Sequence, residues 1–563
     1  MHLQCGGRLF LDLLPACGQI CAQTAPERIR KNKGQNLSDA EAYSDRLWDV
    51  IVIGTGVGGG VAGRRLAEAG LSVLFLEKGT DALRRDQAPF DNTIFDREAR
   101  RIRGFWPEAA RVNIDGVSTD TFLPVGSGVG GSSVFYAAAL ERPEPHDLDD
   151  SKDRPHPTGG WPVSYEAMQP YFEQAEDQFS VHGSPDPLAP DNGALLPELP
   201  DQTEGDKALA EQFRAAGLHP YLTHTALRFL PGCKHCFGFK CPRNCKMDGR
   251  SAGVEPALES GNAQLLGDCE VTRLVGGPDR LSHVEALVKG AQHTFRARSY
   301  VLAGGALGSA RLLLASASPD WPEGCANSSG LVGRNLMFHM NEMVAVWPKK
   351  GFEGASRTIS LRDFYWREGQ RFGAFQAMGV DVRYGDLVHY LNTLFDRSFL
   401  RRWKILRHLI RIPAAIGARV LGNAKIFVGI LEDLPYRENR VTLHDQDPGR
   451  FDITYRIPDE LSARRKLFRR EVRTGLRGIR SRLMGVEPML NLGHPCGTAV
   501  FGTNPAQSVL TPACRAHDVN NLYVVDTSFM PTSMGVNPSL TIAANAMRVA
   551  DIMAQKLKGQ GDE

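Results

Sequence analysis

The chain has 563 residues, of which 42% are hydrophobic and 23% are charged. These proportions are ordinary for a globular protein, and the length exceeds what one core accommodates, so we expect at least two domains. The 66 Lys and Arg residues nearly balance the 64 Asp and Glu residues, which argues against a general nucleic-acid-binding protein.

The start of the chain, within residues 1–45, resembles a secretion signal only loosely, and we expect that it is not one. Their apolar stretch is interrupted by Asp12 and Pro15, and only Arg8 supplies positive charge there. Four of the 11 cysteines fall between 233 and 245 and the others are scattered, which is unlike a secreted disulfide framework. We therefore expect a disordered or extended arm at 1–45 and a cytoplasmic protein.

The first motif is a glycine-rich turn between a strand and a helix. The apolar run 50–53 predicts a buried parallel strand. Gly54, Gly56 and Gly59 follow it with the spacing G-x-G-x-x-G, and Gly58 lies between them. Such glycines permit a tight turn, a close backbone approach to a pyrophosphate and close helix–strand packing, and the helix N-terminus offers N–H groups to phosphates. The motif predicts a dinucleotide site, for either FAD or NAD.

The second strand of this unit, residues 72–76, ends at Glu77. An acid 18 residues beyond Gly59 is placed to accept both hydroxyl groups of an adenosine ribose. Glu77 therefore favours a dinucleotide whose adenosine ribose is unphosphorylated.

A second glycine cluster occupies residues 123–143, LPVGSGVGGSSVFYAAALERP, and includes Gly126, Gly130, Gly131 and Ser132. It resembles the segment that lies under the flavin in the glucose–methanol–choline (GMC) family of flavoprotein oxidoreductases. The resemblance implies that the dinucleotide is FAD and that these four residues contact it. Residues 126–140 contain no histidine suited to covalent attachment, so we expect FAD to be bound non-covalently.

Three further segments are similar to the same family in the same order, and the resemblance covers most of residues 48–553. They are WPVSYEAMQPYFEQAEDQFSVHG at 161–183, SYVLAGGALGSARLLLASAS at 299–318 and NNLYVVDTSFMPTSMGVNPSLTIAANAMRVADIM at 520–553. Tyr136 departs from the pattern, because the family often has Asn near the flavin at this point.

The resemblance implies an α/β fold with a Rossmann-like FAD-binding domain and an α+β substrate domain built on an antiparallel sheet. The predicted FAD-binding domain is discontinuous and comprises residues 46–145, 225–325 and 495–560. The predicted substrate-binding domain comprises residues 146–224 and 326–494.

The catalytic candidates lie near the C-terminus. Oxidation of an alcohol requires a base for the hydroxyl proton, placed close to a hydride acceptor, and the unperturbed pKa of histidine, about 6.5, suits that task. His494 begins a loop of small residues, HPCGTAVFGTNPAQSVL, which leaves space for a substrate. The resemblance to the GMC family implies that His494 is the base and that Asn537 orients the substrate oxygen.

Other residues are candidates for contact with the cofactor. Asp526 ends the run LYVVD and resembles a flavin-contacting acid of the family. Pro538 is expected to fix the turn that presents Asn537, and both residues are expected to contact FAD. Val271 and Ala303 complete the predicted set.

A cluster of four cysteines follows the pattern C-x2-C-x4-C-x3-C at Cys233, Cys236, Cys241 and Cys245. Four thiolates in so short a segment suit a zinc ion or an iron–sulfur cluster, and some GMC dehydrogenase subunits carry such a cluster. Disulfides, or free thiols in a loop over the FAD, are equally weighted alternatives.

The segment 330–490 resembles the family least. Residues 340–348 and 371–385 predict strands of the substrate domain. Residues 397–421 interleave basic and apolar side chains, which suits contact with an anionic membrane surface, a lid over an apolar substrate, or a helix with a solvated basic face. We favour the last of these, and we expect the basic helix at 463–483 to be solvated as well.

These observations predict an FAD-dependent alcohol oxidase or dehydrogenase that passes hydride to flavin N5 while His494 takes the hydroxyl proton. The expected partners are a small-molecule alcohol and oxygen or another electron acceptor, with no nucleic acid; the oligomeric state is open. The alternatives are a flavin-dependent lyase or decarboxylase on the same scaffold and a redox-partner flavoprotein without an alcohol site.

Overall fold

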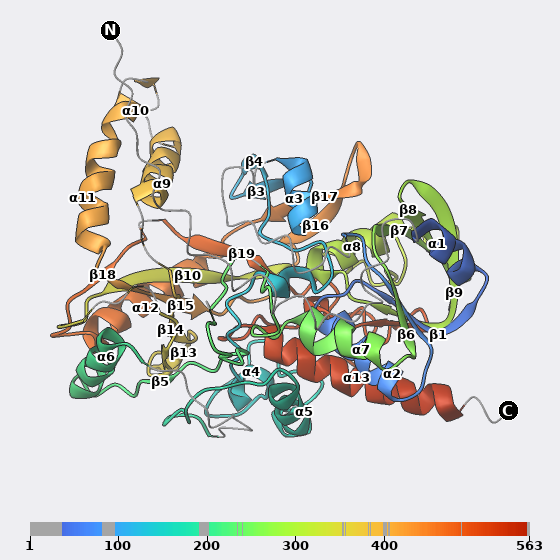
Figure 1. Ribbon diagram of the computed structural model, residues 1–563, viewed down its shortest axis with the longest axis horizontal. Coiled ribbons are helices and arrows are strands. Elements are labelled where there is room, and N and C mark those ends of the chain that lie inside the picture. The colour runs from blue at the N-terminus through green and yellow to red at the C-terminus, as the bar shows by residue number, and fades with distance from the viewer. Residues whose placement is uncertain are drawn as a thin grey trace, which may run out of the picture.

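A computed structural model describes residues 36–80, 96–190 and 202–559, apart from 234, 239, 352, 353, 355, 381, 383, 398–401, 404, 405 and 486. Two large sheets lie next to one another along the long axis of the molecule, and a long C-terminal helix runs beneath one of them (Figure 1). This mixed architecture confirms the predicted α/β fold class.

The first sheet has the strand order β6-β2-β1-β9-β8-β7, and β20 also pairs with β9. Its strands are β1 (Leu47–Ile53), β2 (Val73–Leu76), β6 (Ala263–Leu266), β7 (Cys269–Gly276), β8 (Leu281–Val288), β9 (Ala291–Leu302) and β20 (Leu522–Val524). The start of β9 forms an antiparallel hairpin with β8, and its end lies parallel between β1 and β20. Because β1, β2, β9 and β20 are parallel, their carboxyl ends meet at one edge of the sheet, where ligands bind in open α/β sheets.

Helices that connect the strands of this sheet pack beside it. Helix α2 (Val57–Glu68) comes directly after β1 and packs against α13 (Ser539–Gly559), so the C-terminal segment returns to the nucleotide-binding turn. Further helices of this half are α3 (Arg97–Arg103), α4 (Pro145–Leu148), α5 (Tyr165–Gln178), α7 (Glu255–Glu259) and α8 (Gly305–Ala315).

The second sheet is antiparallel, with the order β18-β10-β15-β14-β11-β5 and with β19 beside β10. Its strands are β5 (Tyr221–Leu222), β10 (Met337–Val346), β11 (Ile359–Leu361), β14 (Phe375–Ala377), β15 (Lys425–Leu431), β18 (Ser481–Leu483) and β19 (Met489–Cys496). Phe213 of α6 (Glu204–Ala215) and Phe468 of α12 (Asp459–Gly475) belong to the same buried apolar cluster as strand residues Phe375 and Phe427. The antiparallel sheet predicted for the substrate half is confirmed.

A third, four-stranded sheet has the order β16-β17-β3-β4. It joins β3 (Ala110–Ile114) and β4 (Val117–Thr121) to β16 (Arg440–His444) and β17 (Asp447–Tyr455). This sheet therefore combines strands from both predicted domains. A small hairpin, β12 (Trp366–Arg367) with β13 (Gln370–Arg371), completes the strands.

The prediction of a disordered or extended arm at 1–45 is wrong for residues 36–44, which form a helix. Helix α1 (Asn36–Ser44) is ordered against the first sheet, and its Ala40 is fully buried. Tyr43 packs edge-on against Trp48 with ring centroids 5.6 Å apart, and its hydroxyl donates to Gln264 at 3.2 Å. Packing against partners distant in sequence stabilises this short helix. Residues 1–35 lie outside the described residues.

The basic segment 463–483 is not the solvated helix that its composition predicts. Its last residues form β18, and two arginines of α12 reach a buried carboxylate on β10. Arg465 and Arg469 donate to Glu342, at 2.8 and 2.7 Å. Glu342 is fully buried, so its charge requires these partners.

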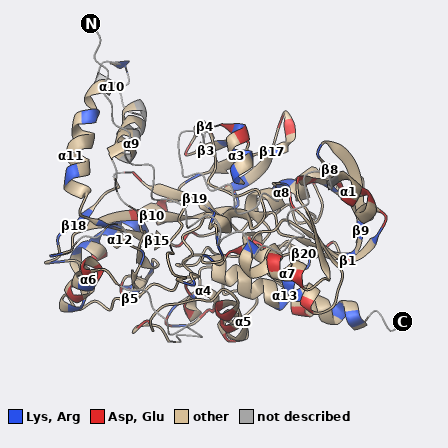
Figure 2. Cartoon of the chain, viewed as in Figure 1, with Lys and Arg blue, Asp and Glu red and all other residues tan. Residues whose placement is uncertain are grey.

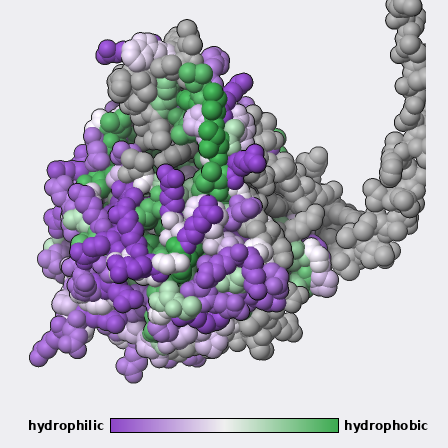
Figure 3. Space-filling model, turned by 90° about the vertical axis from the view of Figure 1, so that its left-hand side faces the viewer, coloured by the Kyte–Doolittle hydropathy of each residue, from purple (hydrophilic) through white to green (hydrophobic). Residues whose placement is uncertain are grey.

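Helices α9 (Tyr384–Arg397), α10 (Leu406–Leu409) and α11 (Arg411–Leu421) project from the substrate half. Helix α11 carries Arg411 and Arg419 and no acidic residue (Figure 2). Hydrophobic side chains gather on this projecting part (Figure 3). Among the described residues, the large exposed apolar side chains here include Tyr384, Trp403, Leu409, Ile412, Ile416 and Val420. Contact with a membrane surface through 397–421 stays an untested alternative to the solvated basic helix that we favour, and no described helix has the length and apolar character to cross a bilayer.

We expect Glu176→Ala to lower the free energy of unfolding by about 3–5 kcal/mol. Arg142 donates to both oxygens of Glu176, at 2.6 and 2.8 Å, and the two side chains are only 4% and 1% exposed. The alanine would leave the guanidinium buried without its carboxylate. Urea denaturation should show this loss, whereas Glu173→Ala, an exposed change on the same helix, should stay within about 0.5 kcal/mol. A change below about 1 kcal/mol for Glu176→Ala would contradict the expectation.

Candidate active site

A cavity of about 620 Å³ lies between the two large sheets, within the range of about 300–1,000 Å³ found for ligand sites. Segments far apart in the sequence contribute to its lining, among them residues 53–58, residues 124–139 with gaps, the end of β19 and the segment before α13. The predicted nucleotide-binding and catalytic segments therefore share one cavity.

The first glycine turn packs as its spacing predicts. Gly54 has φ of 95°, and a Cβ there would collide with the carbonyl of Ala303. A Cβ at Gly58 or Gly59 would likewise strike backbone oxygens, whereas at Gly56 it would meet nothing within 4 Å. Gly54, Gly56 and Gly58 line the cavity, and Gly59 packs behind them. Helix α2 thus begins at the cavity wall with its first N–H groups free of side-chain caps.

The second glycine cluster lies directly against the first. A Cβ on Gly131 would contact the Cα of Gly56, and the Gly130 N–H donates to the Thr55 hydroxyl at 3.2 Å. Ser132 accepts from the Gly126 N–H at 2.8 Å. Gly126, Gly131 and Ser132 line the cavity, whereas Gly130 forms the turn with φ of 97°.

Glu77 lines the cavity, but the protein already uses most of its acceptor capacity. One carboxylate oxygen accepts from the N–H and hydroxyl of Thr55, at 3.1 and 2.5 Å, and the other accepts from the Gly79 N–H at 2.9 Å. A carboxylate has about four acceptor positions. Glu77 therefore holds the glycine turn in place and keeps capacity for one ribose hydroxyl rather than two.

Asp526 also lines the cavity with its oxygens engaged. The carboxylate accepts from the Gly305 and Ser528 N–H groups, each at 2.9 Å, and from the Ser309 and Ser528 hydroxyls, each at 2.5 Å. Burial raises the pKa of Asp526, against these hydrogen bonds, which lower it. In this structure the carboxylate organises the loop after β20, and its contact with flavin stays a prediction. Val271 and Ala303 line the same cavity.

His494 lies in a bulged part of β19 rather than in the predicted loop. Met337 of β10 pairs with Cys496, and His339 pairs with Asn491, so the register moves by two residues on β10 and by five on β19. Such bulges re-aim side chains. His494 lines the cavity, as do Asn537 and Pro538 from the segment before α13.

The imidazole of His494 contacts a second histidine that the sequence analysis missed. The Nδ1 atoms of His494 and His339 are 3.0 Å apart, and their ring planes are nearly perpendicular. Burial lowers the pKa of His494 to about 3, with a further contribution from His339, and burial lowers the pKa of His339 to about 4. Both rings are therefore neutral at neutral pH.

Polar residues of the second sheet face the same space. Asn341 of β10 and Gln376 of β14 line the cavity, and neither was predicted. Their side-chain oxygens, like that of Asn537, are buried without a hydrogen-bond partner among the described residues. The alternation of His339 and Asn341 within the apolar run LMFHMNEMVAV is a signal that could have placed both on one face of a strand.

The four cysteines do lie together, but not as a metal site. Cys236, Cys241 and Cys245 form a buried cluster with Cys233 against it, and none of the four forms a disulfide. Their thiols contact in pairs, Cys236 with Cys241 and Cys233 with Cys245. Among the described residues, no group of three or more His, Cys, Asp or Glu side chains is arranged to hold a metal ion. The predicted zinc or iron–sulfur site is not supported, because tetrahedral ligation needs four sulfurs around one point.

Known proteins resemble this chain over nearly its whole length. Paromamine 6'-oxidase of Streptomyces fradiae is 32% identical over 538 residues, which cover 91% of this chain and 92% of the relative. 2-Methyl-1,2-propanediol dehydrogenase of Mycolicibacterium austroafricanum is 27% identical and covers 92% and 96%. Among solved structures, a variant of Aspergillus oryzae RIB40 formate oxidase superimposes with a TM-score of 0.63 at 15% identity, covering 91% of this chain and 99% of that one.

Two family models complete the comparison. Both are described as GMC oxidoreductase, and they match residues 49–341 and 435–546. The matched regions contain the two glycine clusters, His494 and Asn537. The chain therefore belongs to the GMC oxidoreductase family of flavoprotein oxidoreductases.

Proposed function

We propose that this enzyme oxidises a small-molecule alcohol to a carbonyl compound, with FAD as cofactor, His494 as general base and Asn537 as the residue that orients the substrate oxygen. The observation that carries the proposal is that His494 lines the same cavity as the two glycine clusters. Oxygen or another molecule would accept the electrons.

The residues at the cavity fit FAD. Gly56 leaves open space beside the start of α2, where a pyrophosphate can approach the helix N-terminus. Glu77 keeps one acceptor position for a ribose hydroxyl. The buried side-chain oxygen of Asn537 has no hydrogen-bond partner among the described residues and could accept from an N–H group of FAD. When bound, FAD would supply the acceptor for the hydride that leaves the carbinol carbon.

A side chain of the protein, His494, takes the hydroxyl proton of the substrate. Since Nδ1 of His494 faces His339, the nitrogen available to a substrate is Nε2, which has no hydrogen-bond partner among the described residues. The hydroxyl O–H bond breaks as Nε2 takes the proton, and the electron pair left on oxygen favours loss of hydride from the adjacent carbon. The Asn537 amide would hold the oxygen without competing for the proton.

Alcohols that carry several hydroxyl groups suit the part of the cavity that Asn341 and Gln376 of the second sheet line. The unpartnered amide oxygens of Asn341 and Gln376 require hydrogen-bond donors, which hydroxyl groups supply. Relatives are named for paromamine, 2-methyl-1,2-propanediol and fructose. These three compounds, with cholesterol and an aryl alcohol after other relatives, form the first substrate panel.

Anaerobic mixing with this panel tests the proposal. At least one alcohol should bleach the flavin absorbance and yield the matching carbonyl compound in equal amount. Carbon–carbon cleavage products without bleaching would favour a lyase or decarboxylase. A flavin that no alcohol of the panel or of a wider set reduces would favour a redox partner without an alcohol site.

We expect the acid limb of the pH profile of kcat/KM to lie well below 6.5. His494 must be neutral to act as a base, and its pKa is lowered to about 3 by burial and by His339. Activity should therefore hold as pH falls through 6.5 and decline only when the imidazole becomes protonated at lower pH. Steady-state rates between pH 4 and 8, with stability controls, measure this, and a limb near 6.5 would contradict it.

A further inference from the structure

We propose that His339 is a positioning residue that fixes the tautomer of His494, keeping the proton on Nδ1 and the lone pair of Nε2 toward the substrate. The inference rests on the proposed function of His494 as the base. It explains why a buried histidine on β10 contacts the catalytic candidate on β19.

The proton on His339 is located by its partners. Its Nε2 lies 3.0 Å from the carbonyl oxygens of both Ser533 and Met534. Carbonyl oxygens only accept hydrogen bonds, so Nε2 must carry the hydrogen. Since burial keeps this imidazole neutral, its Nδ1 has a lone pair and no hydrogen.

The tautomer of His494 follows from that assignment. Its Nδ1 lies 3.0 Å from Nδ1 of His339, which carries a lone pair and no hydrogen, so Nδ1 of His494 must donate the hydrogen of this bond. A neutral imidazole carries one N–H. Nε2 of His494 is therefore unprotonated and ready to take a proton, whereas the opposite tautomer would set two lone pairs against one another.

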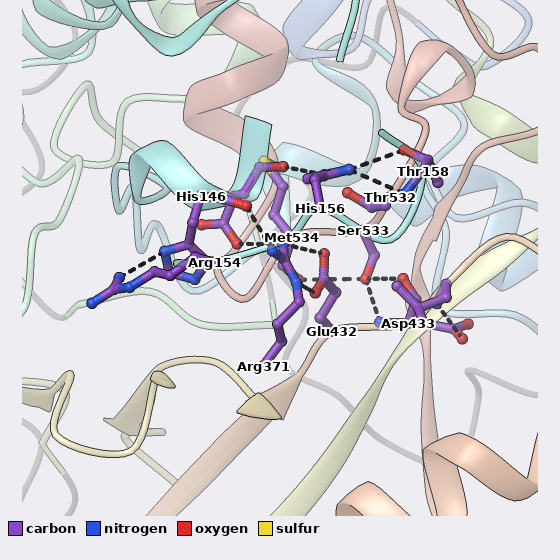
Figure 4. A network of polar contacts seen from close by, with 12 residues as sticks. His146, Arg154, His156, Thr158, Arg371, Glu432, Asp433, Thr532, Ser533 and Met534 are labelled. Carbon is purple, nitrogen blue, oxygen red and sulfur yellow. Dashed lines mark hydrogen bonds and ion pairs between the residues drawn. The ribbon is translucent and has the colours of Figure 1, made fainter. Parts of the chain in front are cut away.

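The two residues whose carbonyls accept from His339, Ser533 and Met534, belong to a buried network with Asp433, and Figure 4 shows these three residues. The Asp433 N–H donates to the Ser533 hydroxyl at 2.7 Å, and this hydroxyl donates to the Asp433 carbonyl at 3.2 Å. The Asp433 carboxylate accepts from the N–H of Phe338, the residue before His339, at 2.9 Å. Asp433 therefore holds both Ser533, whose carbonyl accepts from His339, and Phe338, the backbone neighbour of His339.

The charges near His339 leave it neutral. Glu432 is the carboxylate that acts on this ring, and it is paired with Arg371 at 2.7 Å. Asp433 is buried, and burial raises its pKa to about 7. When His494 holds the substrate proton, His339 accepts a hydrogen bond from the imidazolium without adding negative charge. The proton can therefore leave again readily.

Two substitutions distinguish a positioning role of His339 from a purely structural one. His339→Leu removes the acceptor, so His494 can adopt either tautomer, and kcat should fall about 10- to 100-fold with KM little changed. His339→Asn places an amide oxygen near the former Nδ1 and should restore most of kcat. FAD content and melting temperature are measured for both. Unchanged kcat in His339→Leu, or equal losses in both variants, would overturn the proposal.

A second readout does not depend on turnover. In the holoenzyme labelled with nitrogen-15 histidine, the resonances lost in His494→Ala identify that ring. At pH 7 its Nδ1 should show the shift of a protonated nitrogen and its Nε2 that of an unprotonated one, and this pattern should become mixed in His339→Leu. The reverse pattern in the wild type would overturn the proposal.

The proposal can fail while the proposed function stands. If His494→Ala abolishes alcohol oxidation and His339→Leu does not alter it, His339 has no positioning role. If His494→Ala keeps full activity, the base has been misassigned, whatever the His339 variants show.

Discussion

His494→Ala is expected to lower kcat by about 10²- to 10⁴-fold, the usual contribution of a general base. The alanine removes the imidazole that lines the cavity, and none of the residues that line the nucleotide end is altered. FAD content should therefore match the wild type. Turnover of any alcohol that the wild type oxidises, measured at saturating concentration, tests this.

His517→Ala is the matched control. This histidine lies 23 positions further along the chain, contacts the Ser508 hydroxyl at 3.0 Å and does not line the cavity. Its replacement should leave kcat within about twofold, since it touches neither cofactor nor substrate in the proposal. If both variants kept wild-type turnover, His494 would not be the base.

Gly56→Val is expected to weaken FAD binding at least about 100-fold, because its side chain would occupy the space where phosphates approach the helix N-terminus. A Cβ at Gly56 meets nothing within 4 Å, and φ is −61°, so neither a Cβ clash nor backbone strain opposes the change. The variant should purify colourless and melt at the temperature of wild-type protein stripped of FAD. FAD titration by fluorescence quenching gives the affinity.

Gly277→Val controls for the substitution. Gly277 also has open space around a Cβ and lies outside the cavity lining. This variant should retain FAD and yellow colour. A Gly56→Val protein that binds FAD as the wild type does would place the phosphates elsewhere.

The local motifs could be predicted because their chemistry is local. The turn at Gly54–Gly59 needs a strand before it, a helix after it and small residues between them, and all of these lie within one short stretch of sequence. That Glu77, Ala303 and Asp526 converge on the same cavity follows from topology, since each comes just after a parallel strand of one sheet. His494 and Asn537 were identified through the family resemblance, not through spacing.

The rest depends on partners far apart in the sequence. Arg465 looks like a solvated residue until Glu342, 123 positions away, is placed beside it. His339 is separated from His494 by 155 positions and contacts it across β10 and β19, where the pairing register of the two strands shifts. The cysteine spacing suited a metal, but spacing does not fix whether four sulfurs converge on one point.

The structure of the FAD-bound enzyme with a bound alcohol tests the central claim most directly, namely that the imidazole of His494 and the flavin share one cavity. The account predicts one carbinol group with its oxygen about 3 Å from Nε2 of His494 and its carbon about 3–3.5 Å from flavin N5. A flavin ring bound away from His494, with another side chain at the hydroxyl, would contradict it.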